Sequence, residues 1–577
     1  MSVSSDQNTR MLTALVRLRG ALQAARLPLE LPGVAEHRAA RQQMIDQLED
    51  YAIPRQMSVD APLLAIVGGS TGAGKSTLVN SLVGRRVTAS GLLRPTTRSP
   101  VLVHHPDDAQ WFGQERLLPD LVRVGHSTDD PHSLQLVAAD TVPEGLAILD
   151  APDVDSVEEH NRVLAAQLLA AADLWLFVTS AARYSDQVPW EHLKRAAERD
   201  TAVAIVLDRT PADAVQTVAA HLARMMASRG LKDSPLFTVN EAPISEDGLL
   251  PPAEVADIRG WLASLAADVE AREVVVRRTL DGTVRTLARQ SHAIADAVEE
   301  QLRVAGELRA DVDAAYEHAG ERLVTEATDG TLLRGEVLAR WQDLVGTGEL
   351  LRSLDQRVGK LRERVVNAVK GAPQAADRVA LAIEAGAESL VVDHAESAAT
   401  AASAAWAGSE AGRALLVPGL DRASQEVRRR AEAEVRGWQQ EVVELVKSES
   451  SDKRTSATFL AYGAQGLGTA AMVLVLSRSA DPDGPAAAAA RPGRTLLEAV
   501  LGAESVGHLV DRAAMSLDRR LAALLVDDRR RFHALLGQID LSTDGAEHLR
   551  AASRRVDDRR FEQARGGADT PVPDVNP

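Results

Sequence analysis

The pattern of apolar and polar residues divides the chain into two parts. Between about residues 61 and 260, short apolar runs alternate with longer polar stretches of helical character. Runs of this kind, followed by glycine or other turn residues, are typical of buried parallel strands. They lie at 63–67, 101–103, 146–149, 174–178, 202–207 and 236–239. Strands that alternate with helices predict a doubly wound α/β domain with a mostly parallel sheet.

Beyond Trp261 the strand pattern ends and a helical period begins. Apolar positions from Leu280 to Val312 recur at alternating spacings of four and three residues, which indicates a long helix packed on other helices. Helical sequence rich in Arg, Glu and Ala continues to Ser451. We therefore predict that an elongated all-α helical bundle or stalk follows the α/β domain. The segment 481–494 is predicted to be a loop.

Composition narrows the class of protein. The 577 residues are 45% hydrophobic and 25% charged, and the net charge of −17 argues against a nucleic-acid-binding chain. The absence of cysteine excludes disulfides, thiolate metal sites and cysteine nucleophiles. The N-terminal residues contain no long apolar segment of the signal-peptide kind, so a cytoplasmic chain is expected.

The segment after the first apolar run carries the strongest chemical signal. Residues 69–76, GSTGAGKS, fit G-x-x-x-x-G-K-[ST] without a mismatch, between a predicted strand and a predicted helix. The glycines permit backbone angles that turn several N–H groups toward one anion, and a glycine-rich turn without function is the alternative. Lys75 would reach the β- and γ-phosphates, and the Ser76 hydroxyl would bind Mg²⁺. The predicted nucleotide contacts in this phosphate loop are Gly69, Ser70, Thr71, Gly72, Ala73, Gly74, Lys75, Ser76 and Thr77.

Two further segments fit parts of a nucleotide site. Asp150 ends an apolar run, where a carboxylate can hold Mg²⁺ or its water, although an aspartate opening a turn is the alternative. Between this position and the phosphate loop, the segment RPTTRSP at 94–100 carries Thr97. A threonine on such a loop can close over the γ-phosphate through Mg²⁺ and position the attacking water, with an ordinary loop threonine as the alternative.

These segments, in this order, resemble the bacterial dynamin-like GTPases, and in particular an actinobacterial group of the dynamin family. The resemblance includes the phosphate loop, RPTTRSP, the Asp-Ala-Pro at 150–152, an apolar strand that ends at Asp208-Arg209 and a long helical half. The segments 334–342 and 496–502 are similar to parts of the helical half in that group, so the resemblance extends over most of residues 60–540. The resemblance implies GTP and Mg²⁺ as cofactors and a hydrolase with Lys75 and Thr97 as catalytic residues. It further implies nucleotide contacts at Asp208 and Arg209, and Mg²⁺ held by Ser76, Thr97 and Asp150.

The sequence departs from the family pattern at three positions. Asp153 stands where switch II of the family usually ends in glycine, and a carboxylate near the γ-phosphate is electrostatically unfavourable. Gly72 replaces the serine with which eukaryotic dynamins hold a monovalent cation. The motif [NT]-K-x-D is replaced by residues 208–211, DRTP, with Asp213 nearby but out of register. The preference for guanine therefore rests on family likeness.

Two other functions stay open. A nucleotide-gated scaffold with little turnover is suggested by Asp153 and by the altered base motif. A P-loop ATPase is the other, but a transporter-type ATPase needs an LSGGQ-like segment and a glutamate after Asp150, where Ala151 stands.

The segment 458–476 is uncharged over about nineteen residues, which is just long enough to cross a bilayer. Gly463, Gln465, Gly466 and Gly468 interrupt it, so we considered a full span, a re-entrant paddle and a helix inside a soluble bundle. Attachment to the inner face of the cell membrane, with lipid as a partner, is expected, together with self-association through the G domain and stalk.

The predicted organisation combines these patterns. It consists of N-terminal helices packing on the bundle at 1–60, a P-loop GTPase (G) domain at 61–260, a helical stalk at 261–455, an apolar membrane-associated or paddle segment at 456–512, a C-terminal bundle helix at 513–562 and a disordered tail at 563–577.

Overall fold

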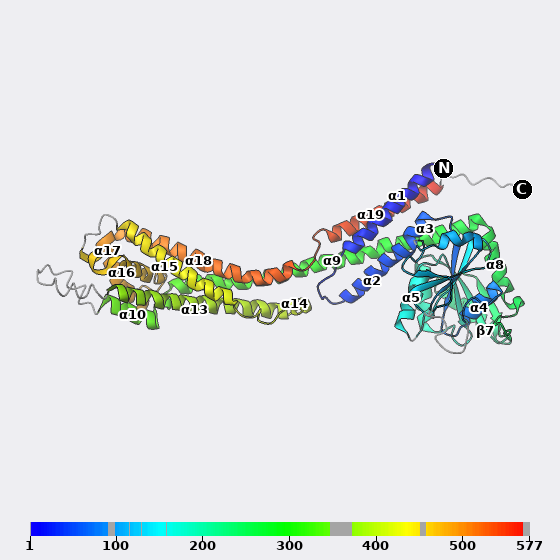
Figure 1. Ribbon diagram of the computed structural model, residues 1–577, viewed down its shortest axis with the longest axis horizontal. Coiled ribbons are helices and arrows are strands. Elements are labelled where there is room, and N and C mark those ends of the chain that lie inside the picture. The colour runs from blue at the N-terminus through cyan, green and yellow to red at the C-terminus, as the bar shows by residue number, and fades with distance from the viewer. Residues whose placement is uncertain are drawn as a thin grey trace. The chain divides into compact units, whose positions relative to one another are not determined.

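The computed structural model describes residues 2–89, 99–114, 116–128, 130–156, 158–346, 372–450 and 457–568. The predicted site residue Thr97 lies outside these ranges. The chain divides into two compact units, drawn in Figure 1. Unit 1 comprises residues 1–27, 33–300 and 541–577, and unit 2 comprises residues 28–32 and 301–540.

Unit 1 is built around a sheet with eight strands among the described residues, in the order β3-β4-β2-β5-β1-β6-β7-β8. Neighbouring strands are parallel except β2 and β5, which are antiparallel. This topology confirms the predicted doubly wound α/β domain. The strands are β1 (Leu63–Gly69), β2 (Val101–His104), β3 (Val122–Val124), β4 (Ser133–Ala138), β5 (Leu146–Asp150), β6 (Leu174–Ser180), β7 (Ala202–Thr210) and β8 (Leu236–Asn240).

Helices surround this sheet (Figure 1). Every residue of β1, β5 and β6 is buried, as expected for central parallel strands that helices cover on both faces. The helices that belong to the α/β part are α4 (Lys75–Val83), η2 (Pro106–Phe112), α5 (Glu159–Ala170), α6 (Gln187–Glu198), α7 (Val215–Ser228), η3 (Pro252–Val255) and α8 (Ala256–Ala267).

Helices from both ends of the chain complete unit 1. Figure 1 shows α1 (Ser2–Ala24) beside α19 (Gly545–Ala568), and the two helices are in contact along their length. Arg550 of α19 bonds Asp296 and Glu299 of α9 (Val269–Thr328) at 2.5 and 2.7 Å. The remaining helices of this group are α2 (Val34–Gln47), the π-helical turn η1 (Leu48–Ala52) and α3 (Ile53–Met57).

A buried ion pair joins α3 to the sheet. The Arg55 guanidinium lies 2.6 Å from Asp173 Oδ2, and both side chains are only 1% exposed. The Asp173 carboxylate also accepts hydrogen bonds from the Tyr51 hydroxyl at 2.9 Å and from the Leu64 amide at 2.9 Å. The position of the N-terminal helices on the α/β part is therefore set by a fully bonded buried charge pair.

Unit 2 consists of helices in its described part. Buried tryptophans connect them, because each indole N–H donates to a backbone carbonyl of another helix at 2.8 Å: Trp341 to Ala489, Trp406 to Leu308 and Trp438 to Ala513. The elements, in addition to the end of α9, are η4 (Thr331–Leu333), α10 (Gly335–Val345), α13 (Ala372–Ala407), α14 (Glu410–Leu415), α15 (Gln425–Glu449), α16 (Ala457–Leu476), α17 (Pro485–Leu501) and α18 (Ala503–Gly537).

The apolar segment 458–476 forms α16. No helix in the described ranges is long and apolar enough to cross a membrane, so the full span considered for this segment is not found. The helix is interrupted at Gly463, whose backbone is non-helical. A Cβ on Gly468 would lie 2.7 Å from the Val443 side chain of α15, so a small residue is required where these two helices meet.

The predicted loop at 481–494 is wrong over most of its length, because α17 begins at Pro485. Pro485 occupies the first turn, where its fixed φ suits a helix and its missing N–H has no cost. Five alanines follow it, and alanine has the highest helix propensity of all residues. The helix accommodates Pro492 in its interior, which the sequence rules alone place at a break.

Candidate functional site

The phosphate loop connects the end of β1 to the start of α4. Gly69 ends the strand with φ 148°, and a Cβ there would lie 2.0 Å from the Val178 carbonyl oxygen of β6. Gly74 directly precedes α4 with φ 99°, so this position also favours glycine. Lys75 is the first residue of α4, and Ser76 and Thr77 follow it. The loop thus leads into a helix N-terminus, which attracts anions.

The carboxyl end of β5 brings Asp150 to this helix. Its Oδ2 atom accepts hydrogen bonds from the Ser76 and Thr88 hydroxyls, both at 2.7 Å. Its Oδ1 atom is buried and has no hydrogen-bond partner among the described residues. Burial raises the pKa of this carboxyl, and the two hydroxyl donors oppose that shift. Asp150 therefore offers a desolvated, half-satisfied carboxylate beside the Ser76 hydroxyl, a combination of hard oxygen atoms that fits Mg²⁺.

Acidic residues of the β5–α5 loop contact the phosphate loop. The carboxylate of Asp153 forms an ion pair with Lys75 Nζ, which also donates to the carbonyl oxygens of Gly69 and Ser70 at 3.1 Å. Asp155 Oδ1 accepts from both the backbone amide and the hydroxyl of Thr71 at 2.6 Å. Two donors that the sequence assigns to phosphate are thus bonded to carboxylates of this chain.

Arg183 holds Asp155 from the other side. Its guanidinium lies 3.0 Å from Asp155 Oδ2, while Asp155 Oδ1 remains bonded to Thr71. Asp155 therefore bridges the phosphate loop and the segment after β6. We define residues 153–155 as the acidic segment of this loop.

Asp208 lies at the carboxyl end of β7, against the phosphate loop. A Cβ on Gly74 would be 2.0 Å from Asp208 Oδ2, which shows how closely the carboxyl approaches the loop. The Arg209 amide donates to Asp208 Oδ1 at 2.7 Å, and Arg209 has a positive φ of 50°. Burial, opposed in part by the hydrogen bond and charge of Arg209, raises the pKa of Asp208 to about 6.

This pKa predicts a pH-dependent stability. The folded protein holds the Asp208 proton more tightly than the unfolded chain, whose carboxyl titrates near 3.8. The stabilisation of the folded state by the protonated Asp208 carboxyl is therefore complete below pH about 4 and is lost as the pH rises through 6. Asp208→Asn, which stays neutral, should raise the free energy of unfolding at pH 8 by about 3 kcal/mol.

Urea unfolding at pH 5 and pH 8 measures this effect. The difference in the free energy of unfolding between wild type and Asp208→Asn should be larger at pH 8 than at pH 5. Asp213→Asn, at an exposed position, should show no such change with pH. An equal gap at the two pH values would contradict the raised pKa.

The structure brings most of the predicted site residues together. The phosphate loop, Asp150 and Asp208 meet at the carboxyl edge of the parallel strands, where α/β proteins bind ligands. Asp155, Thr88 and Arg183 were not anticipated. The closely spaced aspartates at 150, 153 and 155 are the only sequence signal that points to Asp155. Thr88 and Arg183 lie in stretches without a recognisable motif.

Comparison with known proteins agrees with this geometry. Residues 65–208 match the model of the family described as "Dynamin family". No curated protein matches the chain.

Two solved structures were found to be similar to this chain. Both belong to work described as "An oligomerised bacterial dynamin pair provides a mechanism for the long range sensing and tethering of membranes". The first is 10% identical, with 91% of this chain and 94% of that chain covered, at a TM-score of 0.37. The second is 11% identical, with 93% and 80% covered, at a TM-score of 0.27.

The family match begins within β1, ends at Asp208 within β7, and includes the phosphate loop and Asp150. The resemblance seen in the sequence is thereby confirmed. Over residues 65–208 the chain is thus similar to the dynamin family.

Proposed function

We propose that this protein binds GTP with Mg²⁺, hydrolyses it to GDP and phosphate, and couples the reaction to a conformational change of its helical unit. The observation that carries the proposal is the phosphate loop between β1 and α4, next to the bonded Ser76 and Asp150, inside a dynamin-family domain. Catalysis would consist of positioning and charge stabilisation, as is general for phosphoryl transfer.

Each residue has a role in this proposal. The loop amides of 69–77 and the Lys75 ammonium would neutralise the β- and γ-phosphates. Ser76 and Asp150 would hold Mg²⁺, whose chemistry is to neutralise charge on the phosphate oxygens. Thr97 would position the attacking water, as the family resemblance implies. Asp208 and Arg209 would lie on the side of the base, since β7 ends against the loop at Gly74.

Membrane attachment and self-association extend the proposal. Basic residues flank the apolar segment at Lys453, Arg454 and Arg478, which suits an anionic lipid surface. Self-association through the G domain and stalk is the means by which nucleotide state would reach neighbouring copies.

Phosphate release from GTP by the full chain tests the proposal. We expect turnover in the presence of Mg²⁺ and a faster rate with liposomes that contain anionic phospholipid than with neutral liposomes. Tight GTP binding without phosphate release under any of these conditions would overturn the hydrolase assignment.

A nucleotide-gated scaffold is the second candidate, and one contact favours it. The Asp153 carboxylate forms an ion pair with Lys75, so the cation that should stabilise the developing phosphate charge is already neutralised by a side chain of this protein. Such a protein would bind GTP stoichiometrically and respond to liposomes with no gain in turnover.

The Asp153 contact predicts an effect on affinity. Asp153→Asn should tighten GTP binding by about tenfold, because it frees Lys75 and removes a negative charge near the γ-phosphate. Equilibrium titration with a fluorescent, non-hydrolysable GTP analogue measures the change. Asp140→Asn removes the same charge from an exposed position and should bind like wild type. Weaker binding by Asp153→Asn would instead mean that Asp153 supports the nucleotide.

A further inference from the structure

Unit 1 contains a cavity that includes no residue of the phosphate loop. Its volume is about 590 Å³, within the range of sites for small organic ligands. Side chains from α2, η1, α5, α6 and the unit 1 part of α9 line it. Val154 of the acidic segment also lines it, so the cavity adjoins the loop that contacts Lys75 and Thr71.

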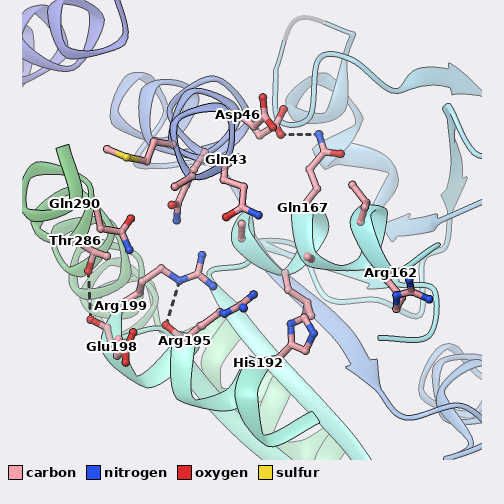
Figure 2. Close-up of a pocket in the computed structure, with 18 of the residues that line it drawn as sticks. Gln43, Asp46, Arg162, Gln167, His192, Arg195, Glu198, Arg199, Thr286 and Gln290 are labelled. Atoms are coloured by element: carbon pink, nitrogen blue, oxygen red, sulfur yellow. Dashed lines mark hydrogen bonds between the residues drawn. The ribbon is translucent and has the colours of Figure 1, made fainter. Parts of the chain in front are cut away.

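One wall of the cavity carries two arginines together with a histidine and a glutamate. Figure 2 shows Arg195, Arg199, His192 and Glu198 on the same side, all from α6 and the residue that follows it. Arg199 Nε donates to the Arg195 carbonyl oxygen at 3.3 Å, and neither guanidinium forms an ion pair within the described ranges. Burial, together with the neighbouring charge of Arg195, lowers the pKa of Arg199 to about 10, and the charges of Tyr51 and Glu198 oppose this shift.

The facing wall, from α2 and η1, is polar and incompletely bonded. Gln43 and Asp46 of α2 lie across the cavity from Arg199 in Figure 2. Asp50 Oδ2 accepts a hydrogen bond from Gln167 at 2.7 Å, but its Oδ1 atom is buried without a partner in the part of the chain that is described. The same holds for Gln47 Nε2. Asp50 is only 3% exposed, so its unpaired oxygen has no access to bulk water.

The surface between these walls is apolar. Met44, Ala166, Leu169, Ala170, Trp175 and Ile294 supply most of it. The cavity therefore combines an apolar body with two guanidiniums at one side, one half-buried at Arg199 and one exposed at Arg195, beside the Glu198 carboxylate. Two guanidiniums that lie close together repel each other, and an anion placed between them would offset that cost.

We propose that this cavity binds a small organic anion, with its oxyanion at Arg195 and Arg199 and its apolar body against the α5 and α9 side chains. Guanidinium pairs suit carboxylate, sulfonate and phosphate groups because each offers planar, paired N–H donors. A hydroxyl or amide at the far end of the ligand would satisfy Gln47 and Asp50. The inference does not depend on nucleotide binding.

Two dyes of nearly equal shape test the site. 8-Anilinonaphthalene-1-sulfonate carries a sulfonate, and N-phenyl-1-naphthylamine has the same rings without a charge. Titration of the full chain without nucleotide should show saturable binding of the sulfonate at least about tenfold tighter than that of the neutral dye. Arg199→Met and Arg195→Met should each abolish this preference while leaving the neutral dye bound as before.

The design separates the site from general apolar adsorption. Arg195 is exposed, so Arg195→Met removes the charge with little effect on packing, even where Arg199→Met disturbs it. Arg224→Met, on an exposed position of α7, should behave like wild type. Equal affinities of wild type for the two dyes, or unchanged sulfonate binding in Arg195→Met, would overturn the proposal.

Displacement then identifies the oxyanion. Decanoate and decyl phosphate, added to the sulfonate complex, distinguish a carboxylate ligand from a phosphate ligand by which of them releases the dye at lower concentration. Failure of both to release it would contradict an organic oxyanion ligand.

Discussion

Replacement of Lys75 by alanine is expected to weaken GTP binding by at least about a hundredfold and to abolish phosphate release. The Lys75 ammonium is 5% exposed at the base of the phosphate loop, where its attraction to a phosphate is little screened by water. Lys75 is the only lysine in the segment 69–77. The backbone amides of the loop alone would leave much of the phosphate charge unneutralised. Isothermal titration and a phosphate-release assay measure the two effects.

The control for this variant is Lys232→Ala, which removes an exposed lysine of the α7–β8 turn and should leave both measurements unchanged. Lys75→Ala also leaves Asp153 without its cation, so combining it with Asp153→Asn should restore thermal stability but not binding. If Lys75→Ala kept its basal rate with and without liposomes, the phosphate loop would not be the catalytic site.

Replacement of Arg55 by methionine is expected to lower the free energy of unfolding by about 3–5 kcal/mol. The variant keeps most of the apolar stem but leaves the Asp173 carboxylate charged in a site that is 1% exposed. Burial already raises the pKa of Asp173, and Arg55 is the main group that opposes this shift. Urea denaturation followed by tryptophan fluorescence measures the loss.

Two further variants identify the cause. Adding Asp173→Asn to Arg55→Met should recover a large part of the loss, because the cost arises from the unpaired charge. Arg550→Met breaks an ion pair in which the arginine is 31% exposed, and it should cost less than about 1 kcal/mol. If Arg55→Met and Arg550→Met had equal effects, the buried pair would not fix the N-terminal helices.

The central strands of the sheet were predictable because their residues are buried on both faces. Continuous apolar runs marked β1, β2, β5, β6, β7 and β8, whereas β3 and β4 were missed. The edge strand β3 has only three residues, and none of them is buried. In β4 only the first two residues are buried, so its apolar pattern ends early. Neither β3 nor β4 therefore gives a continuous apolar run, whereas β8, which is also partly exposed, was still found from its residues 236–239.

The phosphate loop was also predictable, since its chemistry depends on consecutive residues. The contacts that modify it were not, because they join residues far apart in the chain. Asp153 is an evident departure from the family pattern, but its pairing with Lys75 depends on the path of the β5–α5 loop. Likewise, Thr88 reaches Asp150 from 62 positions away, and no spacing rule predicts it.

The segment 458–476 shows a limit of hydropathy. Its glycines are compatible with helix contact in lipid or in protein, so composition alone left both open. The contact of Gly468 with Val443 of α15 is tertiary and could not be predicted from composition.

The central claim is that the site at the phosphate loop binds a guanine nucleotide. Equilibrium titration of the full chain with GTP and with ATP, in the presence of Mg²⁺, tests it most directly. We expect saturable binding of GTP that is at least about tenfold tighter than that of ATP and that is lost in Lys75→Ala. Equal or tighter binding of ATP would contradict the guanine assignment, and binding of neither nucleotide would contradict the phosphate-loop function itself.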